Sequence, residues 1–260
     1  MVNTPLAISP SGQDAATVRH LRLGVGIIAG LLPFVVLIGN MLFEHKFIWL
    51  GSISGSYYTE MRGVFVGSLC AIGVFLIAYR YQKLDDIWST IAGALAIIVA
   101  LFPTPPDTSN GVVTDTQVTI GFVHFAAATS LFLVLAFFCL YIFTRSTPGG
   151  APSTPQKSTR NIVYRVTGCV IVVAIIAAAG IALFVPWSVR ESWNTLFWCE
   201  TAAILAFAIA WLTKGAAFPW WNDPSGAPVS PAAPPISPAV PAAQAVPARG
   251  SEERDVSTAE

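Results

Sequence analysis

Six apolar stretches, separated by short polar segments, account for most of the chain between residues 23 and 213. Each has 17 to 27 residues without Asp, Lys or Arg, and a single Glu falls within one of them. A hydrocarbon core about 30 Å thick is crossed by roughly 20 helical residues, whose backbone must satisfy its hydrogen bonds internally. The pattern therefore predicts six transmembrane helices, at residues 23–43, 63–79, 87–103, 117–143, 166–185 and 195–213.

The Lys and Arg residues between these stretches predict the orientation of the helices. If the N-terminus is cytoplasmic, eleven of the 14 fall in cytoplasmic segments, and only Lys46, Arg62 and Arg190 fall outside. Cytoplasmic loops of membrane proteins carry such an excess. We therefore expect an all-α, polytopic transmembrane bundle of six helices with both termini in the cytoplasm. Its parts are a cytoplasmic tail (1–22), the six-helix domain (23–213) and a Pro/Ala-rich, disordered cytoplasmic tail (214–260).

The composition excludes several classes of protein. Apolar residues make up 54% of the chain and charged residues 11%, against about 25% charged residues in an ordinary soluble domain. The net charge is zero and the sequence has no basic face, so we expect no binding to nucleic acid. The four cysteines, at positions 70, 139, 169 and 199, fall on four predicted helices without metal-ligand spacing. We therefore expect neither a metal site nor a cofactor.

Amide, imidazole and carboxyl side chains within the predicted helices all fall in their outer halves. Asn40 lies near the outer end of the first helix, His124 seven residues into the fourth, and Glu200 five residues into the sixth. Ionisable and amide groups within a membrane usually face the bundle interior or a water-filled cavity. We therefore expect an outward-facing pocket, with His124 as a base or hydrogen-bond donor and Glu200 as its orienting carboxylate. One alternative is a polar pair that only fixes helix packing. The other is a proton relay, for which the inner halves of the helices lack further groups.

The segment before the second predicted helix carries hydroxyls, phenols, a carboxylate and a guanidinium in close succession. A helix N-terminus adds free amide donors and a positive dipole. We therefore expect an anion or lipid-headgroup site here, and its candidate residues are Asn40, Ser54, Tyr57, Tyr58, Glu60 and Arg62. The alternative is a capped helix start with tyrosines at the membrane interface.

Five segments carry a resemblance to a known group of proteins: 52–67 (SISGSYYTEMRGVFVG), 92–104 (AGALAIIVALFPT), 121–138 (GFVHFAAATSLFLVLAFF), 160–168 (RNIVYRVTG) and 197–215 (FWCETAAILAFAIAWLTKG). They resemble uncharacterised six-helix integral membrane proteins of bacteria. That group is distantly similar to the family of the damage-regulated autophagy modulators and a GPI-anchor remodelling factor. The resemblance covers about residues 20–215. It implies a multi-pass protein of the bacterial inner (plasma) membrane with an outward-facing pocket, and it supplies no catalytic residues.

The chain is also similar in class to membrane hydrolases such as alkaline ceramidases and adiponectin receptors, which bind zinc through several His. It departs from them because His124 is the only His within the predicted helices.

Three functions remain open on the sequence. We expect a protein that interacts with lipid through the outer pocket, with the bilayer as its partner and a lipid headgroup as a possible ligand. One alternative is a structural or assembly protein whose polar cluster only fixes helix packing. The other is a small-solute transporter, for which the sequence lacks a visible repeat and has one clear mid-helix interruption, Pro33. Whether the protein is an enzyme, and which proteins it contacts, stay open.

Overall fold

The computed structural model describes residues 12–45, 49–79, 83–106, 113–145, 154–186, 189 and 192–223. The regular secondary structure within these residues is helical throughout. The long helices are α1 (Gly12–Glu44), α2 (Arg62–Ala78), α3 (Lys83–Leu101), α4 (Asp115–Phe137), α5 (Pro155–Phe184) and α7 (Thr195–Lys214). Shorter elements are the 3₁₀ helices η1 (Ser54–Tyr58) and η4 (Pro219–Trp221), and the π-helical turn η3 (Phe138–Ile142) that continues α4.

Five helical segments are long and apolar enough to cross a membrane: Ala16–Glu44, Lys83–Leu101, Asp115–Ile142, Pro155–Phe184 and Thr195–Lys214. Large apolar side chains on their outer surfaces are exposed, for example Phe122 at 73% and Phe184 at 83%. Such side chains are stable against lipid tails and would be unfavourable in water. The predicted all-helical, multi-pass membrane architecture is therefore confirmed for five helices. Helix α2, with 17 residues, is apolar but shorter.

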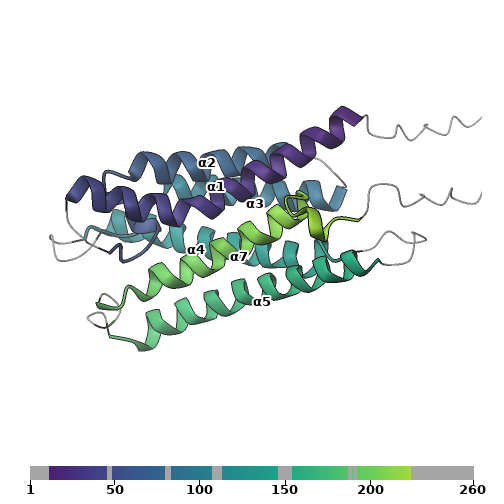
Figure 1. Ribbon diagram of the computed structural model, residues 1–260. Helices are drawn as coiled ribbons and strands as arrows, with labels where there is room; N and C mark the ends of the chain where they lie inside the picture. The colour runs from purple at the N-terminus through teal and green to yellow at the C-terminus, as the bar shows by residue number, and fades with distance from the viewer. Residues whose placement is uncertain are drawn as a thin grey trace, which may run out of the picture. The chain divides into compact units, whose positions relative to one another are not determined.

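The long helices run along a common direction (Figure 1), and the contacts between them close into a ring. Each packs against the next along the chain, and α7 packs back against α1. Gly26 of α1 faces Leu212 of α7, and Gly30 faces Ala208. The residue numbers rise along one helix as they fall along the other, so α1 and α7 run in opposite directions. One end of the ring carries Arg22 of α1 and Lys214 of α7, and we call it the Arg22 end. It lies to the right in Figure 1. The opposite end, where α7 carries Glu200, is the Glu200 end.

Helices α2 and α3 approach each other most closely at a pair of glycines. A Cβ atom on Gly73 would lie 2.8 Å from the carbonyl oxygen of Gly93, and one on Gly93 would lie 2.5 Å from that of Gly73. Only hydrogen fits at these two positions, and small residues are what allow helix backbones to pack so closely in membranes.

Two helices begin well before the predicted membrane segments. Helix α1 starts at Gly12 rather than 23, and α5 at Pro155 rather than 166. At the start of α5 the Thr154 hydroxyl accepts a hydrogen bond from the Lys157 amide, and Pro155 follows as the first helical residue. A capped N-terminus of this kind extends a helix through polar residues that apolar patterning does not detect. The rest of the predicted tails, 1–11 and 224–260, lies outside the described residues.

Candidate functional site

A cavity of about 70 Å³ lies inside the helix ring. Its walls come from α1, α2, α3, α4, α7 and the start of η1. Three polar side chains, Ser54, His124 and Glu200, line it, and every other lining residue is apolar. The sequence expectation that His124 and Glu200 face the bundle interior therefore agrees with their positions.

The cavity is elongated along the helix axes. Its lining residues run from Phe65 to Leu76 on α2 and from His124 to Leu135 on α4. Eleven residues of rise correspond to about 16 Å in each helix. Ser54 and Glu200 lie at one end of this length, so the cavity has a polar end and a long apolar remainder.

Glu200 attaches the segment before α2 to helix α7. Its Oε2 accepts hydrogen bonds from the backbone N–H of Ile53 (2.5 Å) and Ser54 (3.3 Å), and its Oε1 accepts one from the Ser54 hydroxyl (3.0 Å). The two N–H groups lie at the start of η1, where no preceding carbonyl can accept from them. The carboxylate thus satisfies both donors, and Ile53, only 1% exposed, is held against the cavity.

His124 caps the end of α3. Its Nδ1 lies 2.6 Å from the carbonyl oxygen of Phe102, just after α3 ends at Leu101. A carbonyl only accepts, so Nδ1 carries the hydrogen of this bond. Pro105 and Pro106, three and four residues after Phe102, have no N–H to offer its carbonyl, and the imidazole supplies a donor instead. The His124 side chain is 2% exposed.

His124 and Glu200 share the cavity but have different hydrogen-bond partners. Among the described residues, the imidazole pairs with the Phe102 carbonyl and the carboxylate with Ile53 and Ser54. Both arrangements hold backbone segments in place at the Glu200 end. The catalytic roles predicted for the pair stay a prediction.

The other candidate residues of the η1 segment mainly hold one another. The Arg62 guanidinium donates from Nε to the Tyr57 carbonyl (2.5 Å) and lies over the Tyr57 ring, 4.7 Å from its centroid. The Tyr58 hydroxyl donates to the Thr104 carbonyl (2.5 Å), which links this segment to the one after α3. Partial burial and the neighbouring Tyr57 raise the pKa of Tyr58, against an opposing effect of Arg62.

Two further candidates are placed differently. Glu60 is exposed to the surroundings, whereas Asn40 on α1 is 3% exposed. The Oδ1 of Asn40 is buried without a hydrogen-bond partner among the described residues. Of the six residues predicted for a headgroup site, only Ser54 lines the central cavity.

An aromatic layer lies beyond the cavity toward the Arg22 end. Trp211, 1% exposed, follows one turn after the cavity-lining Phe207, with ring centroids 5.0 Å apart. On its other side Trp211 contacts Phe143 (4.9 Å) and Tyr79 (6.1 Å). The polar end of the cavity is therefore the Glu200 end, and its opposite end meets packed rings.

The described residues contain no group of three or more His, Cys, Asp or Glu side chains that could hold a metal ion. All four cysteines are free thiols.

Sequence reasoning missed the partners of both polar residues. The Ile53 amide and the Phe102 carbonyl are backbone groups, and only Pro103 signalled that α3 would end with unpaired carbonyls.

Comparisons with protein-family models, with curated proteins and with solved structures find no match for this chain.

Proposed function

We propose that the chain is a six-span protein of the bacterial inner membrane that holds part of the apolar chain of a lipid in its central cavity. The polar end of that lipid would lie near Ser54, His124 and Glu200. The observation that carries the proposal is the cavity itself, which is long, narrow and apolar, with its polar side chains gathered at one end. Binding sites of this composition fit amphipathic ligands, because a few polar groups orient a mostly apolar molecule.

The course of α2 supports six spans. It packs between α1 and α3 and runs between the same two ends of the ring as they do (Figure 1). Its 17 residues are at the lower limit for crossing a hydrocarbon core. A ring in which α2 stopped short of one surface would leave its neighbours without a partner there.

The distribution of positive charge supports cytoplasmic termini. Arg62 is the only Lys or Arg at the Glu200 end among the described residues, whereas six line one pocket at the Arg22 end. The more basic end of a membrane protein faces the cytoplasm. The Glu200 end, with the polar end of the cavity, would then face outward.

The hydrogen bonds of Glu200 and His124 favour a second candidate, a structural or assembly protein. Both side chains form hydrogen bonds with backbone groups of their own chain. Residues with a purely structural role at helix ends and loops form the same kind of bond. The two proposals differ in one respect that can be measured, which is whether the cavity is occupied by lipid.

The test is to fill the cavity and measure bound lipid. Leu131 of α4 lines the cavity and is 7% exposed, whereas Leu133, two residues away, is 52% exposed. The full chain and the variants Leu131→Trp and Leu133→Trp are purified in detergent, and tightly bound lipid is quantified by mass spectrometry. We expect Leu131→Trp to lose lipid that the wild type and Leu133→Trp retain.

Equal lipid in the three proteins, with matching melting temperatures, would favour the structural candidate. If Leu131→Trp does not fold, the variant Ile204→Trp on α7 fills the same cavity from another wall.

A further inference from the structure

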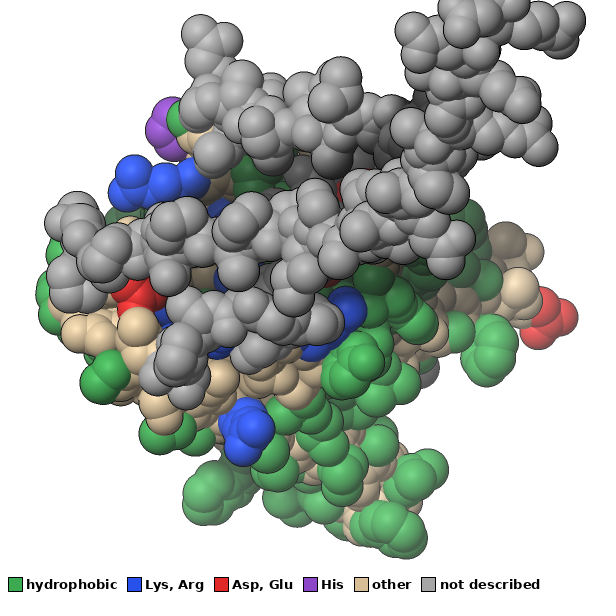
Figure 2. Space-filling model, turned by 90° about the vertical axis from the view of Figure 1, so that its right-hand side faces the viewer, with side chains coloured by type: hydrophobic (Ala, Val, Ile, Leu, Met, Phe, Trp, Pro, Cys, Tyr) green, Lys and Arg blue, Asp and Glu red, His purple; other side chains and the backbone are tan. Residues whose placement is uncertain are grey.

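A second pocket lies at the Arg22 end, on the far side of the aromatic layer from the central cavity. Its volume is about 600 Å³, and its walls come from the ends of α1, α4, α5 and α7 and from the segment after α7. Six positively charged side chains line it: Arg19, Arg22, Arg145, Lys157, Arg160 and Lys214. Asp223 is the only acidic residue among the described lining residues. Figure 2 views this end of the molecule, and Lys and Arg side chains gather on that face.

Two of the arginines are fixed by the end of α7. Arg19 donates from Nε to the Gly215 carbonyl (3.3 Å), and Arg22 donates from Nη1 to the Lys214 carbonyl (3.3 Å). Arg22 also donates from Nη2 to the Tyr79 hydroxyl (2.5 Å). Carbonyls in the last turn of a helix have no partner within it, so these contacts are favourable. They hold both guanidinium groups at the pocket wall in defined positions.

The cations from α5 lie where a helix does not favour them. Lys157 and Arg160 lie in the first two turns of α5. The first turn contains no acidic residue that could balance their charge. The N-terminus of a helix carries a partial positive charge, so cations there are unfavourable for the helix itself. Their presence is explained better by an anion in the pocket than by the stability of α5.

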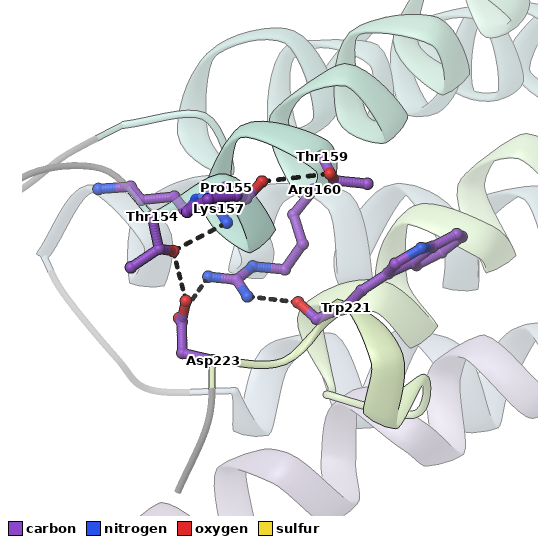
Figure 3. Close-up of polar contacts among 7 residues, drawn as sticks. All are labelled: Thr154, Pro155, Lys157, Thr159, Arg160, Trp221 and Asp223. Atoms are coloured by element: carbon purple, nitrogen blue, oxygen red, sulfur yellow. Dashed lines mark hydrogen bonds and ion pairs between the residues drawn. The ribbon is translucent and has the colours of Figure 1, made fainter. Parts of the chain in front are cut away.

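Asp223 compensates only part of this charge (Figure 3). Its Oδ2 lies 2.9 Å from Nη2 of Arg160, and its Oδ1 accepts a hydrogen bond from the Thr154 hydroxyl. Arg160 also donates to the Trp221 carbonyl (2.5 Å). The carboxylate is therefore already engaged with the start of α5.

Three of the remaining cations have no ion pair with a carboxylate in the described part of the chain: Arg145, Lys157 and Lys214. Arg145 lies over the Tyr141 ring (5.7 Å) and Lys214 over the Phe143 ring (5.2 Å). A buried carboxylate outside the pocket lining, Asp85, accepts a hydrogen bond from the Tyr79 hydroxyl (3.5 Å) and interacts electrostatically with Lys214, Arg22 and Arg145. Among the described lining residues, one carboxylate thus faces six cations.

We propose that this pocket binds a phosphate group, carried either by the headgroup of an anionic phospholipid or by a soluble phosphate compound. A phosphate group concentrates one negative charge as a diester, or about two as a monoester, together with several acceptor oxygens in a small volume. This suits guanidinium and ammonium groups that converge from α1, α5, α7 and the segment after η3. Basic pockets between transmembrane helices near the cytoplasmic surface are suited to anionic lipid headgroups. The site lies beyond the aromatic layer and is independent of lipid in the central cavity.

The test removes two of the three cations whose side chains donate no hydrogen bond to the described protein, Arg145 and Lys157. The double variant Arg145→Gln/Lys157→Gln lowers the charge of the pocket. The matched control is Lys83→Gln/Arg165→Gln, because both control residues are exposed and neither lines the pocket. The full-length proteins are titrated with phosphatidylglycerol, with phosphatidylcholine and with inorganic pyrophosphate, and binding is measured by native mass spectrometry and thermal shift.

We expect the pocket variant to bind phosphatidylglycerol or pyrophosphate about 30-fold more weakly than the wild type, while the control is unchanged. Preference for phosphatidylglycerol identifies a lipid headgroup, and saturation by pyrophosphate alone identifies a soluble compound. Without added anion, the pocket variant should melt at the same or a higher temperature, since like charges have been removed. Equal binding of both anions by wild type and pocket variant would overturn the proposal.

Discussion

Glu200 accepts hydrogen bonds from both the backbone N–H and the hydroxyl of Ser54, although 146 positions separate the two residues in the chain. Together with the Ile53 amide, these contacts join the segment before α2 to helix α7 at the polar end of the cavity. A charge within a membrane helix is costly unless hydrogen bonds satisfy it, so the carboxylate and the segment stabilise each other.

Removing this carboxylate is expected to destabilise the protein. In Glu200→Ala the buried amides of Ile53 and Ser54 lose their acceptor, which costs about 1–3 kcal/mol. The free energy of unfolding is measured by titration with sodium dodecyl sulfate in mixed micelles. Glu60→Ala, which removes an exposed carboxylate at the same end, serves as control and should stay within about 0.5 kcal/mol of wild type. Equal stability of the two variants would contradict the assigned role of Glu200.

His124 is expected to be needed as a hydrogen-bond donor. In His124→Ala the Phe102 carbonyl loses its partner, and the free energy of unfolding should fall by about 1–3 kcal/mol. His124→Gln retains a donor and should recover part of this loss. The same detergent titration measures both variants. If the Ala and Gln variants are equally stable, the capping of α3 by the imidazole does not contribute.

The contact between α2 and α3 should not tolerate a methyl group at Gly73. A Cβ there meets both the Gly93 carbonyl and the Ile97 side chain, so Gly73→Ala should lower the free energy of unfolding by about 1–3 kcal/mol. Gly67, on the same helix, has no neighbouring atom within 4 Å of such a Cβ. Gly67→Ala should therefore be neutral. A neutral Gly73→Ala variant would mean that the two helices are further apart than described.

The Asp223 contact should respond to acid. Hydrogen bonds from Thr154 and Arg160 lower the pKa of Asp223 below its ordinary value of 3.8. The contribution of a carboxylate with a lowered pKa is complete above the ordinary value and is lost as the pH falls through the folded-state value.

The free energy of unfolding of the wild type and of Asp223→Asn is measured from pH 7 to pH 2. The other acidic residues titrate in both proteins, so the difference between the two curves reports on Asp223 alone. We expect a small difference at pH 7 that disappears at the acid end, since exposed pairs contribute little. A difference that grows toward low pH would contradict the pairing.

Much of the fold was predictable because lipid imposes simple rules. Long apolar stretches must be helical, and the few polar groups inside them must face inward, which places His124 and Glu200 at the cavity. Their hydrogen-bond partners were not predictable, because the Ile53 amide and the Phe102 carbonyl are backbone groups present at every residue.

The basic pocket was not predictable for a different reason. In the sequence its Lys and Arg residues fall in widely separated segments, near residues 20, 145–160 and 214, and they indicate only which end is more positive. The pocket forms because α1, α5 and α7 all bring polar helical turns to the Arg22 end, beyond the apolar stretches. Arg19 and Gly215, for example, are 196 positions apart and yet share a hydrogen bond.

The central claim is that a lipid chain occupies the cavity, and photo-crosslinking tests it most directly. Full-length protein in a bilayer is labelled with a phospholipid that carries a photoreactive group in its acyl chain, and the modified residues are identified by peptide mass spectrometry. We predict adducts at cavity-lining Leu131 or Leu135, and their loss when Ile204→Trp fills the space from the opposite wall. Adducts confined to exposed positions such as Phe122 and Leu133 would contradict the account.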